Sequence, residues 1–290
     1  MHLKCKNGTV AIIVAYNPEV DLLNSNLKVL EKQVDKIVIV NNGTEEIKIT
    51  SIDESMYLVI NNNENLGISK ALNIGMEFAI NYGYNYALLL DQDSTIADDA
   101  VEIMIQGFDN KKIAMVVPQI VYINGKPDKI DTNFDFNKVS HAITSGSLID
   151  LNVINFISWG NSTFFNEDFF IDCVDFDFCL ELGIKGYDIL KSTKAKLYQR
   201  LGEMNEKKIL IFSFYPSNHN KIRRYYITRN RLYMWKKYYK IQSKYVIKDI
   251  VYSLREFGMM ILFENDRKEK LKYLWRGIED FNKKKVGKIG

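Results

Sequence analysis

The chain has 290 residues, which is enough for one large domain or two modest ones. Hydrophobic residues make up 47% and aromatic residues 12%, a composition that allows a packed core and excludes wholesale disorder. The net charge of +3 hides an asymmetry, because residues 191–290 carry 26 basic and 9 acidic side chains (+17) while residues 1–190 carry 13 and 27 (−14).

Segments typical of strands and of helices alternate over the first 120 residues. Four apolar runs predict buried strands: Thr9–Ala15, Lys36–Val40, Tyr57–Ile60 and Tyr86–Leu90. Between them, apolar residues at helical spacing predict helices over Leu22–Val34 and Ile68–Ala79. The alternation predicts an α/β fold built on a doubly wound, mainly parallel sheet that is flanked by helices.

The rest of the chain divides into a less regular part and a helical part. Residues 121–215 lack a clear period and are expected to complete the first domain. From about Asn220 three apolar faces at helical spacing predict a C-terminal helical extension. We therefore expect one domain over residues 1–218 and a basic, helical region over residues 219–290.

Polar residues follow each of the four predicted strands. They are Tyr16-Asn17, Asn41-Asn42, Asn61–Asn65 and Asp91–Asp93. Loops at the carboxyl ends of parallel strands line a common crevice in which ligands bind. The sequence therefore predicts a polar binding site of about nucleotide size at this edge of the sheet.

Asp91 and Asp93 are the first of two acidic clusters. Two carboxylates one residue apart in a loop can both face a hard cation such as Mg²⁺ or Mn²⁺. The alternative is an ordinary turn in which Asp93 or Ser94 caps the helix that follows. The position at the end of the fourth predicted strand favours the metal site.

The second acidic cluster contains Asp172, Asp175 and Asp177 and precedes a helix-like stretch. Acidic residues in the first turn of a helix complement its dipole, which would be a structural role. Neighbouring phenylalanines would instead desolvate a carboxylate and raise its pKa, as suits a general base. The local sequence leaves both readings open.

The basic C-terminal region interleaves Arg and Lys with Tyr and Trp between Arg223 and Tyr239. Such a helix suits an anionic membrane surface, and a solvated basic face is an equal alternative; nucleic acid is not expected as a partner. No apolar run approaches the ~18 residues of a membrane span. The odd, low count of 3 Cys is typical of reduced thiols in a cytosol.

The ordered segments resemble family 2 glycosyltransferases of the GT-A fold, and within them the bacterial rhamnosyltransferase-like branch. The matching stretches are Val10–Pro18, Val38–Gly43, Asn65–Gly75, Leu88–Ser94, Ile143–Ile149, Phe170–Tyr187 and Arg224–Asn230. The resemblance implies a catalytic domain over 1–218, with a nucleotide-binding half of about 1–95 and an acceptor half of about 96–218. It also implies inverting transfer of a sugar from a nucleotide-sugar donor.

The resemblance assigns roles to individual positions. Asp175 would be the catalytic base. The donor site would contain Ala15, Tyr16, Asn41, Asn65, Asp91 and Arg200. A divalent cation, Mn²⁺ or Mg²⁺, would be held by Asp93 with Asp91 and Gln199. Ser145, Gly146, Asp172 and Asp177 would hold the acceptor or support the base.

Three positions depart from the usual pattern of the family. Asn41 stands where Asp is usual, Glu181 where Arg is common, and Gln199 where His is common. An amide oxygen binds a hard cation more weakly than a charged ligand does.

The resulting expectation is rhamnose transfer from dTDP-rhamnose to a glycan or a lipid-linked or surface-polysaccharide acceptor. The alternatives are a UDP-sugar donor (glucose or galactose) and a non-catalytic protein that binds sugar nucleotides or polyanions. We expect a cytoplasmic enzyme, peripheral on the inner face of the cell membrane, with a homodimer as an alternative role for the C-terminal helices.

Overall fold

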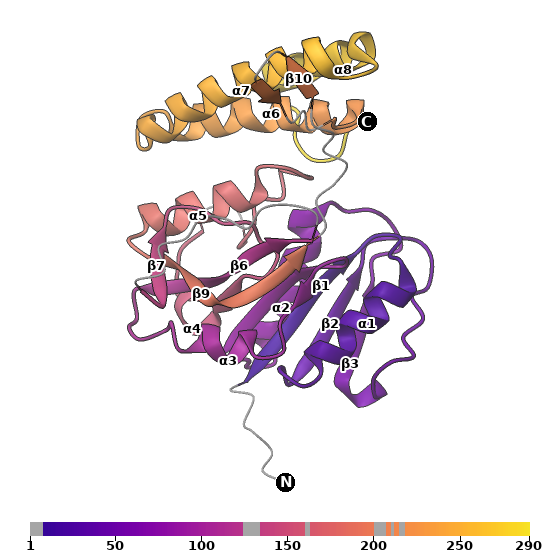
Figure 1. Ribbon diagram of the computed structural model, residues 1–290, viewed down its shortest axis with the longest axis vertical. Coiled ribbons are helices and arrows are strands. Elements are labelled where there is room, and N and C mark those ends of the chain that lie inside the picture. Colours follow the sequence, from indigo (N-terminus) through magenta and orange to yellow (C-terminus); the bar gives the residue numbers. More distant parts are fainter. Residues whose placement is uncertain (1–7, 124–133, 160–162, 200–206, 210–211, 215–217) are drawn as a thin grey trace. The chain divides into compact units, whose positions relative to one another are not determined.

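The computed structural model describes residues 8–123, 134–159, 163–199, 207–209, 212–214 and 218–290. Their contacts divide them into two units (Figure 1). The first unit contains the described residues of Met1–Glu167 and Val174–Arg200. The second contains those of Asp168–Cys173 and Leu201–Gly290.

Four parallel strands form one half of the sheet in the first unit. They are β1 (Thr9–Ala15), β2 (Lys36–Asn41), β3 (Tyr57–Asn61) and β4 (Tyr86–Asp91), in the order β3-β2-β1-β4. All four predicted strands are confirmed, and three extend one residue further than predicted. The ladder pairs Ala15 with Asn41 and Asn41 with Asn61, because backbone hydrogen bonding continues whether or not the side chain is apolar.

Five further strands complete a nine-stranded sheet, beyond β4 in the order β8-β6-β9-β5 with β7 paired to β9. They are β5 (Thr95–Ile96), β6 (Ile113–Tyr122), β7 (Phe136–Val139), β8 (Leu148–Asp150) and β9 (Asp188–Gln199). β6 and β9 run parallel, while β8, β5 and β7 pair with their neighbours in the antiparallel sense. One register shift between β6 and β9 falls at Pro118, which has no amide hydrogen for the ladder.

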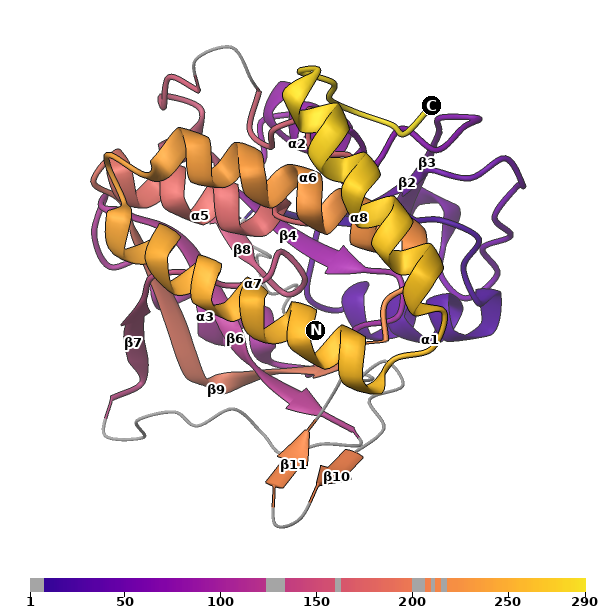
Figure 2. The same cartoon turned by 90° about the horizontal axis from the view of Figure 1, so that it is seen from above.

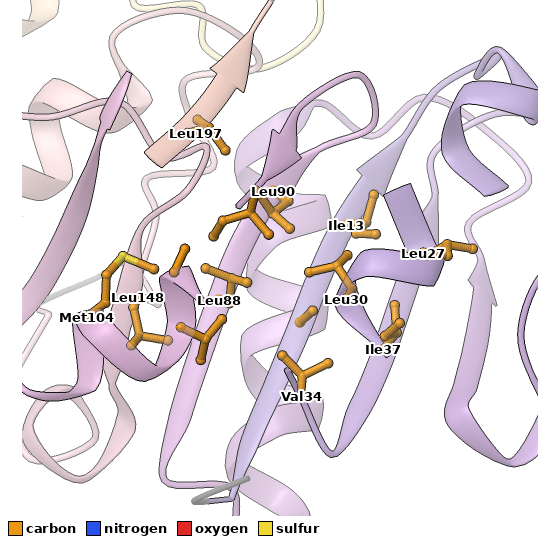
Figure 3. Packing of buried hydrophobic residues seen from close by; sticks show 14 of the residues in the cluster. Ile13, Leu27, Leu30, Val34, Ile37, Leu88, Leu90, Met104, Leu148 and Leu197 are labelled. Carbon is orange, nitrogen blue, oxygen red and sulfur yellow. The ribbon is translucent and has the colours of Figure 1, made fainter. Parts of the chain in front are cut away.

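Helices pack on both faces of this sheet (Figure 1). On one face, α1 (Val20–Leu30) and α3 (Ala100–Ile105) enclose a core that includes Leu27, Met104 and Leu88 (Figure 3). On the other face, α2 (Ile68–Asn81) contacts β1, β2 and β4. Shorter elements are a 3₁₀ turn η1 (Glu54–Met56), α4 (Leu151–Ile154) and α5 (Val174–Ile184). The predicted α/β architecture with a helical C-terminal extension is therefore confirmed.

The second unit contains the three C-terminal helices and a hairpin. The helices are α6 (Lys221–Tyr238), α7 (Ser243–Phe263) and α8 (Arg267–Asn282), and α6 packs against both of the others (Figure 2). The hairpin pairs β10 (Lys207–Ile209) with β11 (Phe212–Phe214). Within the described ranges, every helix is too short or too polar to cross a membrane.

The segment Asp168–Cys173 belongs to the second unit because α6 holds its backbone. The amide of Asn230 donates to the carbonyls of Ile171 (2.8 Å) and Asp172 (3.1 Å). The buried guanidinium of Arg229 donates to the Asp168 carbonyl at 3.2 Å. Asp172 and Cys173 both have φ of 66°, a region that costs non-glycine residues roughly 1–3 kcal/mol each. The contacts from α6 offset that cost.

Candidate active site

The carboxyl ends of β1, β2, β3 and β4 place their polar residues along one edge of the sheet. Ala15 pairs with Asn41, Asn41 with Asn61, and Val14 with Asp91. Tyr16, directly after β1, is 50% exposed. The backbone arrangement therefore brings together the strand ends that the sequence singles out.

Asn41 is buried and held by the protein itself. Its Nδ2 donates to the Glu45 carbonyl (2.8 Å) and to Asn61 Oδ1 (2.9 Å), and its Oδ1 accepts from the Gly43 amide (3.1 Å). Both amide hydrogens are thus engaged, so a nucleobase could meet this side chain only through Oδ1.

Asn65 is part of a second amide network, centred on the buried Asn42. Asn42 Nδ2 donates to Asn65 Oδ1 at 3.1 Å, and Asn42 Oδ1 accepts from the Leu66 amide at 3.0 Å. Asn65 Oδ1 also accepts from the Gly67 amide at 2.9 Å. The network fixes the loop that leads into α2. The sequence indicates that this loop is polar, but it does not reveal that Asn42 is its centre.

Gln92, between the two predicted acidic ligands, joins the ends of β1 and β4. Its Oε1 accepts from the Tyr16 amide at 2.7 Å and its Nε2 donates to the Tyr16 carbonyl at 3.3 Å. This pair of bonds sets the backbone of Tyr16 beside the Asp91–Asp93 loop. Sequence analysis includes Gln92 in the polar strand end Asp91–Asp93 but assigns it no role of its own, and its place between the two aspartates is the signal that could have suggested one.

Asp91 is the more enclosed of the two carboxylates at this edge. Burial, with the neighbouring Asp93 carboxylate, raises the pKa of Asp91 to about 6, and a hydrogen bond from Ser145 acts in the opposite direction. Asp93 is exposed. A positive charge bound here would favour the ionised form of Asp91, because an opposite charge lowers the pKa of a carboxyl group.

Ser145 and Gly146 support the Asp91–Asp93 loop from behind. The buried Ser145 Oγ accepts from the Asp91 amide at 3.0 Å and donates to Ser94 Oγ at 3.0 Å. Gly146 has φ of 83°, and a Cβ there would lie 2.8 Å from Pro118 Cγ. The backbone at Gly146 donates to the Leu89 carbonyl at 2.7 Å, so this turn is fastened directly to β4.

The short strand β5 sets the backbone of β9 near Gln199 alongside the same loop. Thr95 pairs with Tyr198 and Ile96 with Leu197 in the antiparallel sense. Continuing that register leads from Tyr198 to Gln199 on β9 and from Thr95 back toward Ser94 and Asp93. Gln199 is half-buried. Arg200, the predicted contact to the diphosphate, lies outside the described residues.

The residues at this edge fit a cation that is shared with a substrate. Within the described ranges, His, Cys, Asp and Glu side chains do not gather in threes around a point that could hold a metal. Asp91, Asp93 and Gln199 supply two carboxylates and one amide. Mg²⁺ is commonly held by one or two carboxylates together with substrate phosphates, and this donor set suits that type of site.

Asp175 lies in the first turn of α5 and is half-buried, and its Oδ1 accepts from the Phe176 amide at 2.9 Å. Phe176 is 37% exposed and its ring lies 5.5 Å from that of His141. Both rings line a cavity of about 530 Å³, whose wall also includes Ser145 and Lys191. The cavity thus runs from the neighbour of Asp175 to the serine that supports Asp91.

The other two aspartates of the second cluster occupy different surroundings. Asp177 is 3% exposed, on the buried side of α5. Asp172 belongs to the second unit, where Arg223 donates to it from Nη2 (3.0 Å) and Nε (3.1 Å). Burial raises the pKa of Asp172, and the Arg223 charge opposes that rise. Arg223 is a partner that spacing in the sequence could not reveal.

Comparisons with known proteins identify the family to which the chain belongs. The family model described as "Glycosyl transferase family 2" matches residues 10–170, more than half of the chain. The chain belongs to glycosyl transferase family 2. It is also 27% identical over 283 residues to the dTDP-rhamnosyl transferase RfbF of Shigella flexneri, which covers 90% of this chain and 91% of that protein.

Solved structures of low sequence identity share the fold of this family 2 enzyme. GalNAc-T7 with UDP, GalNAc and Mn²⁺ superposes with a TM-score of 0.63 at 14% identity, over 94% of this chain and 55% of that one. S. aureus TarS superposes with a TM-score of 0.57 at 14% identity, over 93% and 48%. The chain therefore spans about half the length of these two proteins. The TarS 1–349 complex with UDP-GlcNAc superposes with a TM-score of 0.55 at 13% identity, over 94% of this chain and 80% of that one.

Proposed function

We propose that this family 2 glycosyltransferase is an inverting enzyme that moves rhamnose from dTDP-rhamnose onto a lipid-linked or surface-polysaccharide acceptor. The observation that carries the proposal is the cavity beside α5. Its wall contains Phe176, the neighbour of Asp175, and Ser145, which is bonded to the backbone of Asp91. This open cavity lies between the residue next to the candidate base and the serine that supports the candidate donor site.

In the proposed reaction, Asp175 removes the proton from an acceptor hydroxyl while that oxygen attacks the anomeric carbon. The bond from that carbon to the diphosphate breaks, and the nucleoside diphosphate leaves from the opposite face. A divalent cation held by Asp93, Asp91 and Gln199 would neutralise charge on the diphosphate. Tyr16 and Asn41 would border the nucleoside, in positions set by Gln92 and Asn61.

The choice of donor rests on the resemblance to the Shigella flexneri dTDP-rhamnosyl transferase. UDP-glucose and UDP-galactose are the competing donors, because donors that differ by one hydroxyl are distinguished by only a few contacts. The cavity favours a sugar-sized acceptor group, since the Phe176 and His141 rings offer apolar faces beside the polar Ser145. A lipid-linked acceptor would bring the enzyme to the inner face of the cell membrane.

The proposal is tested with a donor panel and two substitutions. With purified lipid-linked glycan as acceptor, dTDP-rhamnose should support transfer and the two UDP-sugars should not. Asp175→Asn should lower kcat by a factor of about 10² to 10⁴, as expected for loss of a general base. Asp93→Asn should weaken the Mn²⁺-dependent rise in melting temperature with dTDP. The control is Asp109→Asn, an exposed aspartate that contacts the adjacent Asn110.

The donor, the catalytic base and the enzyme class can each be contradicted by a different result. Transfer from a UDP-sugar alone would refute the donor and keep the enzyme class. Full activity of Asp175→Asn would refute the role of the base. Binding of dTDP-rhamnose without transfer or hydrolysis, across a broad acceptor panel, would instead establish a non-catalytic sugar-nucleotide-binding protein.

A further inference from the structure

The outward face of α7 carries an apolar stripe. Five of its side chains are between 36% and 65% exposed and fall on one side of the helix: Ile247, Ile250, Val251, Leu254 and Leu262. Their spacing of three, four and seven residues is that of a single helical face. A contiguous apolar patch on a protein surface marks a site that contacts another protein or a membrane.

The carboxylates of α7 all point away from this stripe. Arg231 of α6 binds Glu256 at 2.5 Å and Asp249 at 3.5 Å, and Trp235 Nε1 donates to Asp249 at 2.7 Å. At the end of the helix, the buried Glu264 binds Arg224 at 2.7 Å and Lys270 at 2.9 Å. The acidic groups are thus neutralised within the second unit and contribute no negative charge to the outer face.

The charges that border the stripe are positive. Lys244, Lys248 and Arg255 are exposed, and at 100° per residue all three fall along one flank of it. An apolar face with cations along its edge is the pattern of a helix that lies in the plane of a membrane interface. A second copy of the chain is a poorer occupant, because a symmetric pairing through this face would oppose the same cations.

We propose that α7 docks this enzyme on the surface of an anionic phospholipid bilayer, with Ile247, Val251 and Leu254 inserted among the headgroups. Lys244, Lys248 and Arg255 would contact the lipid phosphates. The helix would lie flat in the plane of the membrane interface. This proposal goes beyond the sugar transfer and does not depend on which donor is used.

Vesicle co-sedimentation of the full chain tests the docking. One set of vesicles is pure phosphatidylcholine, and the other contains phosphatidylcholine and phosphatidylglycerol in equal parts. The wild type should bind the anionic vesicles at least about tenfold more tightly than the neutral ones, since each cation near the surface contributes about 1 kcal/mol, or about fivefold. Raising the ionic strength should reduce that difference.

The double variant Ile247→Glu with Val251→Glu should bind anionic vesicles at least about tenfold more weakly than the wild type, because it removes apolar area and adds negative charge. The matched control is Tyr82→Glu with Phe156→Glu, two exposed side chains of the first unit that receive the same charge change; it should bind like the wild type. Both variants should hydrolyse the donor at the wild-type rate, a readout that keeps docking separate from catalysis.

Three results would overturn the docking proposal. The first is equal vesicle binding by the wild type and by the α7 variant, and the second is no vesicle binding by the wild type. The third is a dimer in analytical ultracentrifugation without lipid that the α7 variant abolishes and the control keeps, which would assign the stripe to a second copy of the chain.

Discussion

Ser145 links two loops that are 54 residues apart in the chain. Its Oγ accepts a hydrogen bond from the Asp91 amide and donates one to Ser94 Oγ. The Ser145 side chain is buried. Ser145→Ala would leave the Asp91 amide without its partner, which costs about 1–3 kcal/mol for a buried group. We expect a lower melting temperature and a higher KM for the nucleotide sugar, with a smaller change in kcat. Thermal unfolding and steady-state kinetics measure these quantities.

The control for this prediction is Ser25→Ala. Ser25 is exposed on α1 and its Oγ donates to the Asp21 carbonyl of its own helix, so its removal should change stability by less than about 0.5 kcal/mol. A Ser145→Ala enzyme with the wild-type KM would mean that the hydrogen bond to Asp91 does not position the donor site.

The packing of α2 on β1 depends on Gly75. A Cβ at this position would lie 2.3 Å from Ile12 Cγ2, and Ile12 is fully buried. Gly75→Ala should therefore destabilise the protein by about 1–3 kcal/mol through overpacking, although alanine is the better helix former by about 1 kcal/mol. Urea unfolding measures the difference.

Gly183 supplies the matched control within the same unit. It lies in α5, and a Cβ there would meet nothing within 4 Å. Gly183→Ala should stabilise the protein by about 0.5–1 kcal/mol, because only the helix-propensity gain applies. If Gly75→Ala stabilised the protein as much as Gly183→Ala, the close approach of α2 to β1 would be refuted.

At the scale of helices and strands, the sequence predicts the elements well, but it predicts poorly which elements and residues they pair with. The run Thr9–Ala15 is found with the predicted bounds, because a strand buried on both faces is a continuous apolar segment. The bond from Ser145 to Asp91 and the pairing of β5 with β9 join residues far apart in the chain. Such pairings follow from register and topology, which no local pattern encodes. The same reason explains why the hydrogen-bonding roles of Gln92 and Asn42 were not predicted.

The two units carry different titratable groups whose pKa values are shifted from their ordinary values. His219, in the second unit, precedes the N-cap of α6. Partial burial, with the charges of Arg223 and Arg224, lowers the pKa of His219 to about 4 from its ordinary 6.5. The unfolded chain therefore binds a proton between pH 6.5 and pH 4 that the folded unit excludes. The contribution of the neutral His219 imidazole to the free energy of unfolding is complete above pH 6.5 and is lost as the pH falls toward 4.

A probe confined to the second unit is needed to see this effect, since Asp91 in the first unit titrates in the same range with a pKa of about 6 and acts in the opposite sense. Of the 3 Trp, Trp235 and Trp275 lie in the second unit and Trp159 in the first. In a Trp159→Phe background, urea unfolding followed by fluorescence should show the second unit about 1 kcal/mol less stable at pH 5 than at pH 7; the figure is reduced because the imidazole is only partly buried. Adding His219→Gln should remove most of that difference. If the pH dependence persisted unchanged in the His219→Gln protein, the carboxylates of the second unit, rather than this imidazole, would govern its acid sensitivity.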